Sequence, residues 1–171
     1  MNKLQAWDVG LSQHLALTQI DSRWQLAAKI AHLGDGSLVF GTLALAVLAG
    51  WLLKRPDLML AMGILLVILL VTATVVVIVK YTLRRERPRD PTGFVTISYD
   101  KYSFTSGHSA RMSCLAVTML FFNLPLGLLL LLLAIMVAAA RVVVGVHYLG
   151  DVIVGLIVGA ATALATIKII F

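Results

Sequence analysis

Long apolar runs without charged residues, separated by short polar stretches, set the pattern of this 171-residue chain. Four runs cover residues 36–53, 58–79, 112–140 and 152–167, and the third is interrupted by the turn sequence Asn123-Leu124-Pro125. A helix needs about 20 largely apolar residues to cross roughly 30 Å of hydrocarbon. The pattern therefore predicts an all-α, polytopic transmembrane helix bundle with about five spans.

The N-terminal segment follows a different pattern, in which apolar residues recur at helical spacing between polar ones: Leu4, Trp7, Leu11 and Leu15. This spacing is typical of an amphipathic helix that lies in the membrane interface, and a helix packed on the bundle would show the same pattern. Trp7 and Trp24 would serve as anchors. Neither interpretation of residues 1–20 gives them a chemical role. We expect one domain, residues 1–171, with an interfacial N-terminal segment (1–33) and a transmembrane core (34–171).

Composition supports a membrane protein and narrows the function. Hydrophobic residues make up 60% of the chain and charged residues 13%, and the mean hydropathy is +0.98, which soluble domains do not tolerate. The net charge is +6, but no basic stripe interleaved with aromatics is present, which argues against nucleic acid. Most basic residues lie between Lys80 and Arg111, beside apolar runs, where they would meet anionic lipid headgroups. Cys114, the only cysteine, is expected to be a packing residue.

Polar residues that membrane segments rarely tolerate fall in three groups. They are residues 80–88, the tripeptide Ser106-Gly107-His108, and Arg141 with His147 and Asp151. Such residues usually face a cavity or one another and indicate function. With five spans, the groups lie at the end of the second span, the start of the third, and between the fourth and fifth. All three are then on one side of the membrane.

The cations of these groups suit a phosphoryl group. Lys80, Arg87 and Arg141 would bind its nonbridging oxygens, as guanidinium and ammonium groups do in phosphoryl transfer. Ser106 and Gly107 stand at the expected start of a helix, where free backbone N–H groups and the helix dipole also attract anions. The sequence therefore predicts a phosphate site.

Two histidines can carry the reaction. His147 and Asp151 are four residues apart, so on one helix they would lie on the same face and meet. The carboxylate would fix the imidazole tautomer while the other ring nitrogen attacks phosphorus. His108 would protonate the departing oxygen as a general acid.

Other interpretations of these polar residues are more ordinary. Two histidines and an aspartate can bind zinc, but neighbouring cations repel a divalent ion and no HxH or HExxH spacing is present. We therefore expect no metal and no cofactor. Single basic residues at helix ends are usually snorkelling anchors, and we expect this for several of Arg84, Arg85, Arg89, Lys101 and Arg111. His14 and His32 have no partner in the sequence and are expected to be interfacial or packing residues.

The three groups resemble the signature of the type 2 phosphatidic acid phosphatase (PAP2) superfamily. Its first motif, Lys-x6-Arg-Pro, matches residues 80–88. Its second, Pro-Ser-Gly-His, matches residues 105–108 with Thr105 in the place of proline. Its third, Ser-Arg-x5-His-x3-Asp, matches residues 140–151 with Ala140 in the place of serine and every interval kept. Neither departure removes a group assigned above to chemistry.

The resemblance implies a helical membrane core, a phosphohistidine intermediate at His147, His108 as the acid, and no required metal. It also implies a small bacterial lipid phosphatase of the cytoplasmic membrane, acting on undecaprenyl diphosphate, phosphatidylglycerol phosphate, phosphatidic acid or lipid A phosphates. An active site on the extracytoplasmic side fits Lys54-Arg55 and Lys168 at the opposite, cytoplasmic side. Aromatic residues of the long loop are candidates for a lipid entrance: Phe94, Tyr99 and Tyr102.

Three other functions use some of the same residues. A lipid phosphotransferase would pass the phosphate of a phosphohistidine to another acceptor, and a non-catalytic phospholipid carrier would need the cations but not His147. A vanadate-dependent oxidation is disfavoured by membrane burial. The sequence makes no prediction of the oligomeric state.

Overall fold

Helices make up the fold of the computed structural model, which describes residues 3–88 and 101–170. Within these residues the only β pairing is an isolated bridge between Glu86 and Tyr102. The helices are α1 (Lys3–Leu15), α2 (Ser22–His32), α3 (Gly36–Leu52), α4 (Pro56–Leu83), α5 (Gly107–Phe122), α6 (Leu124–Val143) and α7 (Leu149–Ile170). The predicted all-α class is confirmed.

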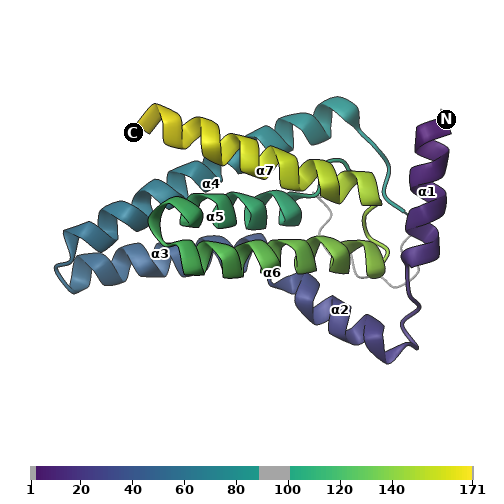
Figure 1. Ribbon diagram of the computed structural model, residues 1–171, viewed down its shortest axis with the longest axis horizontal. Helices are drawn as coiled ribbons and strands as arrows, with labels where there is room; N and C mark the ends of the chain where they lie inside the picture. Colours follow the sequence, from purple (N-terminus) through teal and green to yellow (C-terminus); the bar gives the residue numbers. More distant parts are fainter. Residues whose placement is uncertain (1–2, 89–100, 171) are drawn as a thin grey trace.

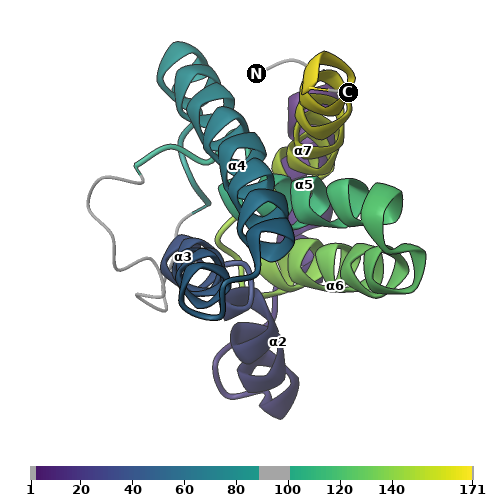
Figure 2. The same ribbon diagram turned by 90° about the vertical axis from the view of Figure 1, so that its left-hand side faces the viewer.

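The helices α3 to α7 run along the long axis of the molecule, and α1 stands across one end of them (Figure 1). The end-on view in Figure 2 shows α5 at the centre, between α4, α6 and α7. Three described helices, α4, α6 and α7, are long and apolar enough to cross a membrane, and α2 with α3 makes a fourth if this pair, bent by 40°, is one span. Helices α3 and α5 are apolar and only slightly shorter, with 17 and 16 residues.

Local sequence signals account for the helix boundaries. Asp21, Ser106 and Asn123 precede α2, α5 and α6, and each accepts a hydrogen bond from a backbone N–H of the first turn. Pro56 starts α4, where its missing N–H costs nothing. The same helix ends at Arg84, which adopts a left-handed conformation with φ 48°. The turn predicted at Asn123 is confirmed.

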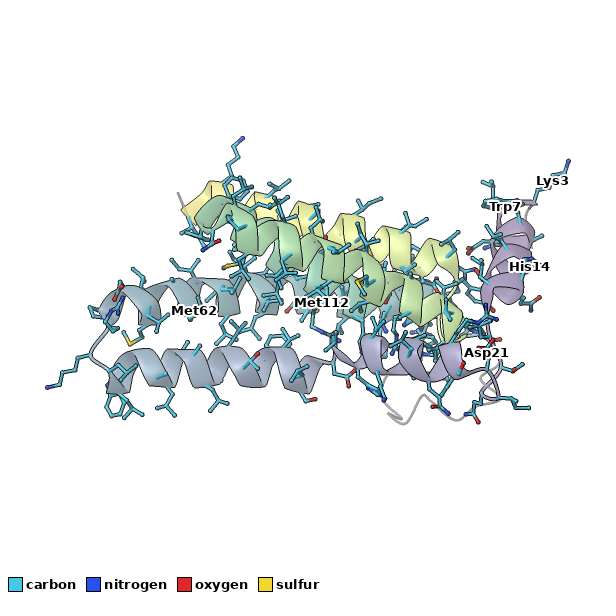
Figure 3. All side chains as sticks on the ribbon, turned by 60° about the horizontal axis from the view of Figure 1, so that its bottom comes forward. Lys3, Trp7, His14, Asp21, Met62 and Met112 are labelled. Atoms are coloured by element: carbon cyan, nitrogen blue, oxygen red, sulfur yellow. The ribbon has the colours of Figure 1, made fainter. Side chains whose placement is uncertain are left out.

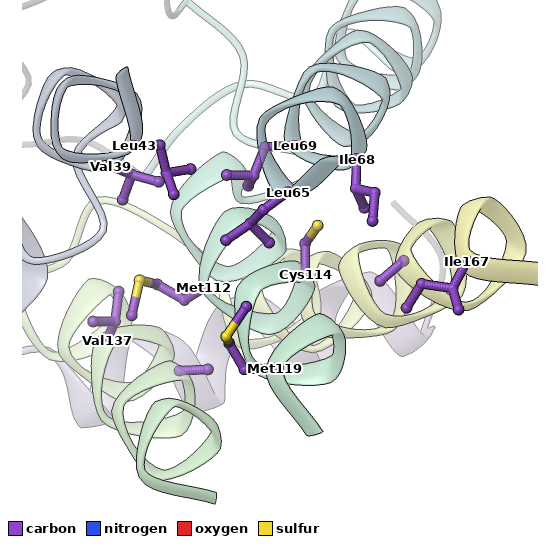
Figure 4. Close-up of a cluster of buried hydrophobic side chains, with 12 residues drawn as sticks. Val39, Leu43, Leu65, Ile68, Leu69, Met112, Cys114, Met119, Val137 and Ile167 are labelled. Carbon is purple, nitrogen blue, oxygen red and sulfur yellow. The ribbon is translucent and has the colours of Figure 1, made fainter. Parts of the chain in front are cut away.

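The main core lies where α3, α4, α6 and α7 surround α5 (Figure 4). Ile68 and Leu69 of α4 and Cys114 of α5 are fully buried in it, which confirms Cys114 as a packing residue. Met112 lies in the middle of the bundle (Figure 3). Many large apolar side chains on the outer faces are exposed instead, as expected for helices that have lipid as their solvent.

Two glycines allow α7 to lie directly against α5. A Cβ atom on Gly155 would be 2.6 Å from the carbonyl oxygen of Ser106. On Gly159 it would collide with the carbonyl group of Ala110, with the carbonyl carbon 2.8 Å away. Small residues four apart on one helix face thus allow close helix packing here.

The N-terminal helix α1 contacts the end of the bundle instead of only lying in the interface. Its Ser12 is buried, and the Ser12 hydroxyl oxygen accepts a hydrogen bond from the backbone N–H of Leu149, at the start of α7. Trp7 is 66% exposed, and Lys3 extends away from the bundle (Figure 3). One face of α1 is therefore docked while another is open to its surroundings.

Candidate active site

The three polar groups meet at the end of the bundle that α1 covers. The backbone N–H of Ser106 donates to the backbone carbonyl of Asp151 at 3.0 Å, which ties the second group to the third. The N–H of Ser103, just before the second group, donates to the carbonyl of Arg85 at 2.8 Å. Parity of the spans predicted this convergence.

The predicted phosphate-binding cations lie around His147. Lys80 is buried at the end of α4, and its ammonium donates to the carbonyl of Tyr102 at 3.1 Å. Arg87 donates to the carbonyl of Val146 at 3.1 Å, and the same nitrogen, Nη1, is 3.3 Å from Nε2 of His147. Arg141 is buried near the end of α6.

His147 lies in the loop between α6 and α7, outside the membrane-spanning segments, and its side chain is buried. Burial and the positive charges of Arg141, Arg87 and Lys80 hold the pKa of His147 well below its ordinary value of 6.5. A guanidinium can only donate, so Nε2 of His147 is the accepting nitrogen and carries the lone pair. The imidazole is therefore neutral near pH 7.

The four-residue spacing predicted that His147 and Asp151 share a helix, and this arrangement was wrong. The histidine precedes α7, which begins at Leu149, because residues 144–148 turn the chain between two helices. His147 Nδ1 and Asp151 Oδ2 still lie close together, 3.6 Å apart. That separation is longer than a hydrogen bond, but it leaves the carboxylate on the Nδ1 side of the ring.

Arg85, expected to be among the snorkelling anchors, instead binds the carboxylate of Asp151. Its Nη1 donates to Asp151 Oδ1 at 2.8 Å, while its Nη2 donates to Asp8 of α1 at 2.7 Å. The guanidinium also lies over the ring of Tyr148, 4.1 Å from the ring centroid. Tyr148 adds its own N–H, which donates to Asp151 Oδ2 at 2.9 Å.

The carboxylate of Asp8, in α1, contacts two groups next to Asp151, which the sequence did not indicate. Its carboxylate accepts from the guanidinium of Arg85 and from the N–H of Gly150 in the first turn of α7, at 2.9 Å. A carboxylate is favoured at a helix N-terminus by the unpaired N–H groups and the helix dipole. Helix α1 thus holds both the start of α7 and the arginine that contacts Asp151.

His108 contacts the carboxylate of Asp35, which the sequence did not indicate. In the first turn of α5, its Nε2 is 2.6 Å from Oδ1 of Asp35, in the loop between α2 and α3. The other oxygen of Asp35 is 2.8 Å from Nδ1 of His32. His32 therefore has a partner three residues along the chain. Arg111, one of the basic residues among which snorkelling anchors were expected, donates from its guanidinium to the carbonyl of Gly34 at 2.9 Å.

Two cavities adjoin these residues. The first, of about 540 Å³, lies between the end of α1 and the third group, and Arg87, His147 and Tyr148 line it. The second, of about 530 Å³, lies between α3, α4 and α5. It has Lys80, His108, Arg111 and Asp35 among its polar residues and an apolar wall from α4.

The two departures from the family pattern are buried. Thr105 is fully buried before α5, and Ala140 packs among the alanines of α2. Of the aromatic residues predicted for a lipid entrance, Phe94 and Tyr99 lie outside the described residues. Tyr102 packs edge-to-face on Tyr81, with ring centroids 5.5 Å apart.

Comparison with known proteins finds a similar fold in two solved structures and a matching family model. The fold is similar to the crystal structure of a transmembrane PAP2-type phosphatidylglycerolphosphate phosphatase from Bacillus subtilis, with a TM-score of 0.80 and 24% identity over 99% of this chain and 87% of that one. It is also similar to LpxE from Aquifex aeolicus, with a TM-score of 0.69 and 21% identity over 94% of each chain. The PAP2 superfamily model matches residues 61–171. That match covers more than half of the sequence and all three motifs, so the chain belongs to the PAP2 superfamily.

Proposed function

We propose that this protein is a membrane lipid phosphatase that uses His147 as a nucleophile and needs no metal. The observation that carries the proposal is the environment of this buried imidazole. Its Nε2 faces the guanidinium of Arg87 at 3.3 Å, and its Nδ1 faces the carboxylate of Asp151 at 3.6 Å. A nucleophilic histidine requires a free lone pair on one nitrogen and a carboxylate on the other side.

The bound phosphate would complete this arrangement. Its nonbridging oxygens attract Arg87 away from Nε2, while Lys80 and Arg141 stabilise the charge that spreads over the oxygens during transfer. The first turn of α5, which follows its N-cap Ser106, adds the backbone N–H groups of Gly107 and His108, which have no partner within the helix. A divalent metal would add positive charge where three cations already lie, so the proposal assigns it no role.

The reaction proceeds in two balanced steps. Nε2 of His147 forms a bond to phosphorus as the bond to the leaving oxygen breaks, and that oxygen takes a proton from Nδ1 of His108. Water then attacks the phosphohistidine, gives a proton back to His108 and breaks the N–P bond. Asp151 stabilises the positive charge on the ring in both steps.

A lipid substrate is supported by the second cavity, which joins polar and apolar surfaces. Lys80 and His108 line its polar end, and Ala73, Val76 and Val77 of α4 form part of its apolar wall. A phosphorylated headgroup at the polar end of this cavity and an acyl or prenyl chain along its apolar wall would suit such a lining. Phosphatidylglycerol phosphate, phosphatidic acid and undecaprenyl diphosphate are the candidate substrates.

We further propose that the site faces the extracytoplasmic side. Lys54 and Arg55, in the α3–α4 turn at the opposite end of the bundle, fit the excess of basic residues in cytoplasmic loops. A cysteine introduced at Leu53 in a Cys114→Ser background would then resist a membrane-impermeant maleimide in intact cells. Labelling in intact cells would contradict this orientation.

Phosphate release by the purified protein in detergent tests the proposal. We expect release from at least one of the three candidate lipids with EDTA present, a loss of at least ~10³-fold in His147→Ala, and little change in His14→Ala. His14 is an exposed histidine of α1 and serves as the matched control. Equal release by His147→Ala, or activity abolished by EDTA, would contradict the proposal.

A further inference from the structure

The loop between α2 and α3 packs against the start of α5 and contacts His108, the histidine proposed as the acid. Oδ1 of Asp35 is 2.6 Å from Nε2 of His108. His32 contacts the second oxygen, Oδ2, at 2.8 Å from its Nδ1. The side chain of His108 is 13% exposed and that of His32 is 57% exposed, so the carboxylate connects a nearly buried imidazole with one at the surface.

Two further contacts fix this loop against α5. Arg111, one turn beyond His108, donates to the carbonyl of Gly34 from Nε at 3.2 Å and from Nη2 at 2.9 Å. The loop also passes so close that a Cβ atom on Gly34 would be 3.1 Å from Cβ of His108 and 3.0 Å from a methyl group of Val137. The position of the carboxylate is therefore set by packing as well as by its own hydrogen bonds.

The contact determines which nitrogen of His108 can act on a substrate. A carboxylate only accepts hydrogen bonds, so Nε2 carries a proton and Nδ1 is the nitrogen that exchanges one. Arg141 and Arg111 both place positive charge near His108. Asp35 is the negative group in direct contact with the ring, and it offsets this charge when Nδ1 is protonated.

We propose that Asp35 is a positioning residue for His108, holding its ring so that Nδ1 faces the leaving oxygen, and that His32 orients the carboxylate from the other side. This inference rests on the proposed function. Each histidine of the site then has its own carboxylate, Asp151 for His147 and Asp35 for His108. The proton leaves Nδ1 for the departing alkoxide in the first step and returns to Nδ1 from water in the second, while the Nε2–H stays bonded to Asp35.

A comparison of leaving groups distinguishes this role from a structural one. Short-chain phosphatidic acid releases an alkoxide that needs a proton, whereas 4-nitrophenyl phosphate releases a stable anion that does not. Wild type, Asp35→Asn, His32→Gln and His108→Ala would be assayed with both substrates. Asp57→Asn, at an exposed aspartate in the first turn of α4, is the matched control.

We expect Asp35→Asn to lower kcat/KM, which reports the first step, by roughly 10–100-fold for phosphatidic acid and by less than about threefold for 4-nitrophenyl phosphate, since general acids contribute about 10²–10⁴-fold. His32→Gln should show the same selectivity with a loss of a few fold, and it tests the same contact should Asp35→Asn not fold. Equal losses with both substrates, or no loss with either, would overturn the positioning role. A wild type inactive with all three candidate lipids would instead contradict the proposed function.

Discussion

Replacing Arg85 by methionine removes the link between α1 and the carboxylate beside the nucleophile while keeping much of the side-chain volume. The guanidinium donates to Asp151 at 2.8 Å and to Asp8 at 2.7 Å, and Asp151 is fully buried. A hydrogen bond to a charged group contributes about 1.5–3 kcal/mol. Loss of the bond that places Asp151 would therefore lower kcat/KM by roughly 10–100-fold, at about 1.4 kcal/mol per factor of ten.

The neighbouring arginine provides a matched control. Arg84 is exposed, and its guanidinium donates to the carbonyl of Tyr81, in its own helix. Arg84→Met should therefore change kcat/KM by less than about threefold. Both variants would be assayed for phosphate release under the conditions that give wild-type activity.

A double-mutant cycle shows whether α1 acts through this arginine. Asp8→Asn alone should lower activity, and its effect should shrink when Arg85 is already methionine, because the two side chains share one ion pair. Activity of Arg85→Met within threefold of wild type would refute the reasoning. Additive effects of Asp8→Asn and Arg85→Met would show that α1 does not act through Arg85.

Three further predictions concern the packing of α7 on α5, the pKa of His147 and the role of Lys80. Gly159→Ala should lower the thermal unfolding temperature in detergent because the added Cβ atom would collide with α5. Gly63→Ala is the control, because open space surrounds its added methyl group. Equal unfolding temperatures of the two variants would contradict this packing. Because cations keep the pKa of His147 low, Arg87→Met should raise that pKa and move the acid limb of kcat/KM to higher pH; an unmoved limb would refute the coupling. Lys80→Met should lower kcat as well as raise KM, because Lys80 stabilises the charge that spreads over the phosphate oxygens during transfer; an unchanged kcat would contradict this role.

Periodic features of the fold could be read from the sequence. Each uncharged run became a helix, and the turn at Asn123 separates α5 from α6 as predicted. The three polar groups converge because helices that alternate in direction return the chain to the same end of the bundle. The spacing of Gly155 and Gly159 was also informative, since small residues four apart lie on one helix face.

Contacts between distant residues were not predictable from this pattern. Arg85 bonds to residues 66 and 77 positions away, and His108 to one 73 positions away. Arg85 and Arg84 are identical neighbours, and only the left-handed end of α4 decides which one turns inward. Asp8 is one of several polar residues in the amphipathic N-terminal segment, and Asp35 lies in a short polar stretch between two helices, so no local signal marked either of them.

The spacing of His147 and Asp151 was informative but led to the wrong geometry. Four residues place two side chains on one helix face, but here α7 begins only after His147. The loop still brings the two groups within 3.6 Å. Proximity was therefore predicted correctly, although the helical arrangement was not.

The central claim is a covalent phosphate on His147, and trapping it is the most direct test. Wild type, His147→Ala and His108→Ala would be mixed with a 32P-labelled lipid phosphate, quenched after short times in denaturant at alkaline pH, and mapped by mass spectrometry. The account predicts label on His147 that is stable to alkali and lost in acid, slower labelling in His108→Ala because the leaving oxygen no longer receives a proton, and none in His147→Ala. Phosphate release without any labelled protein, or label on another residue, would contradict it.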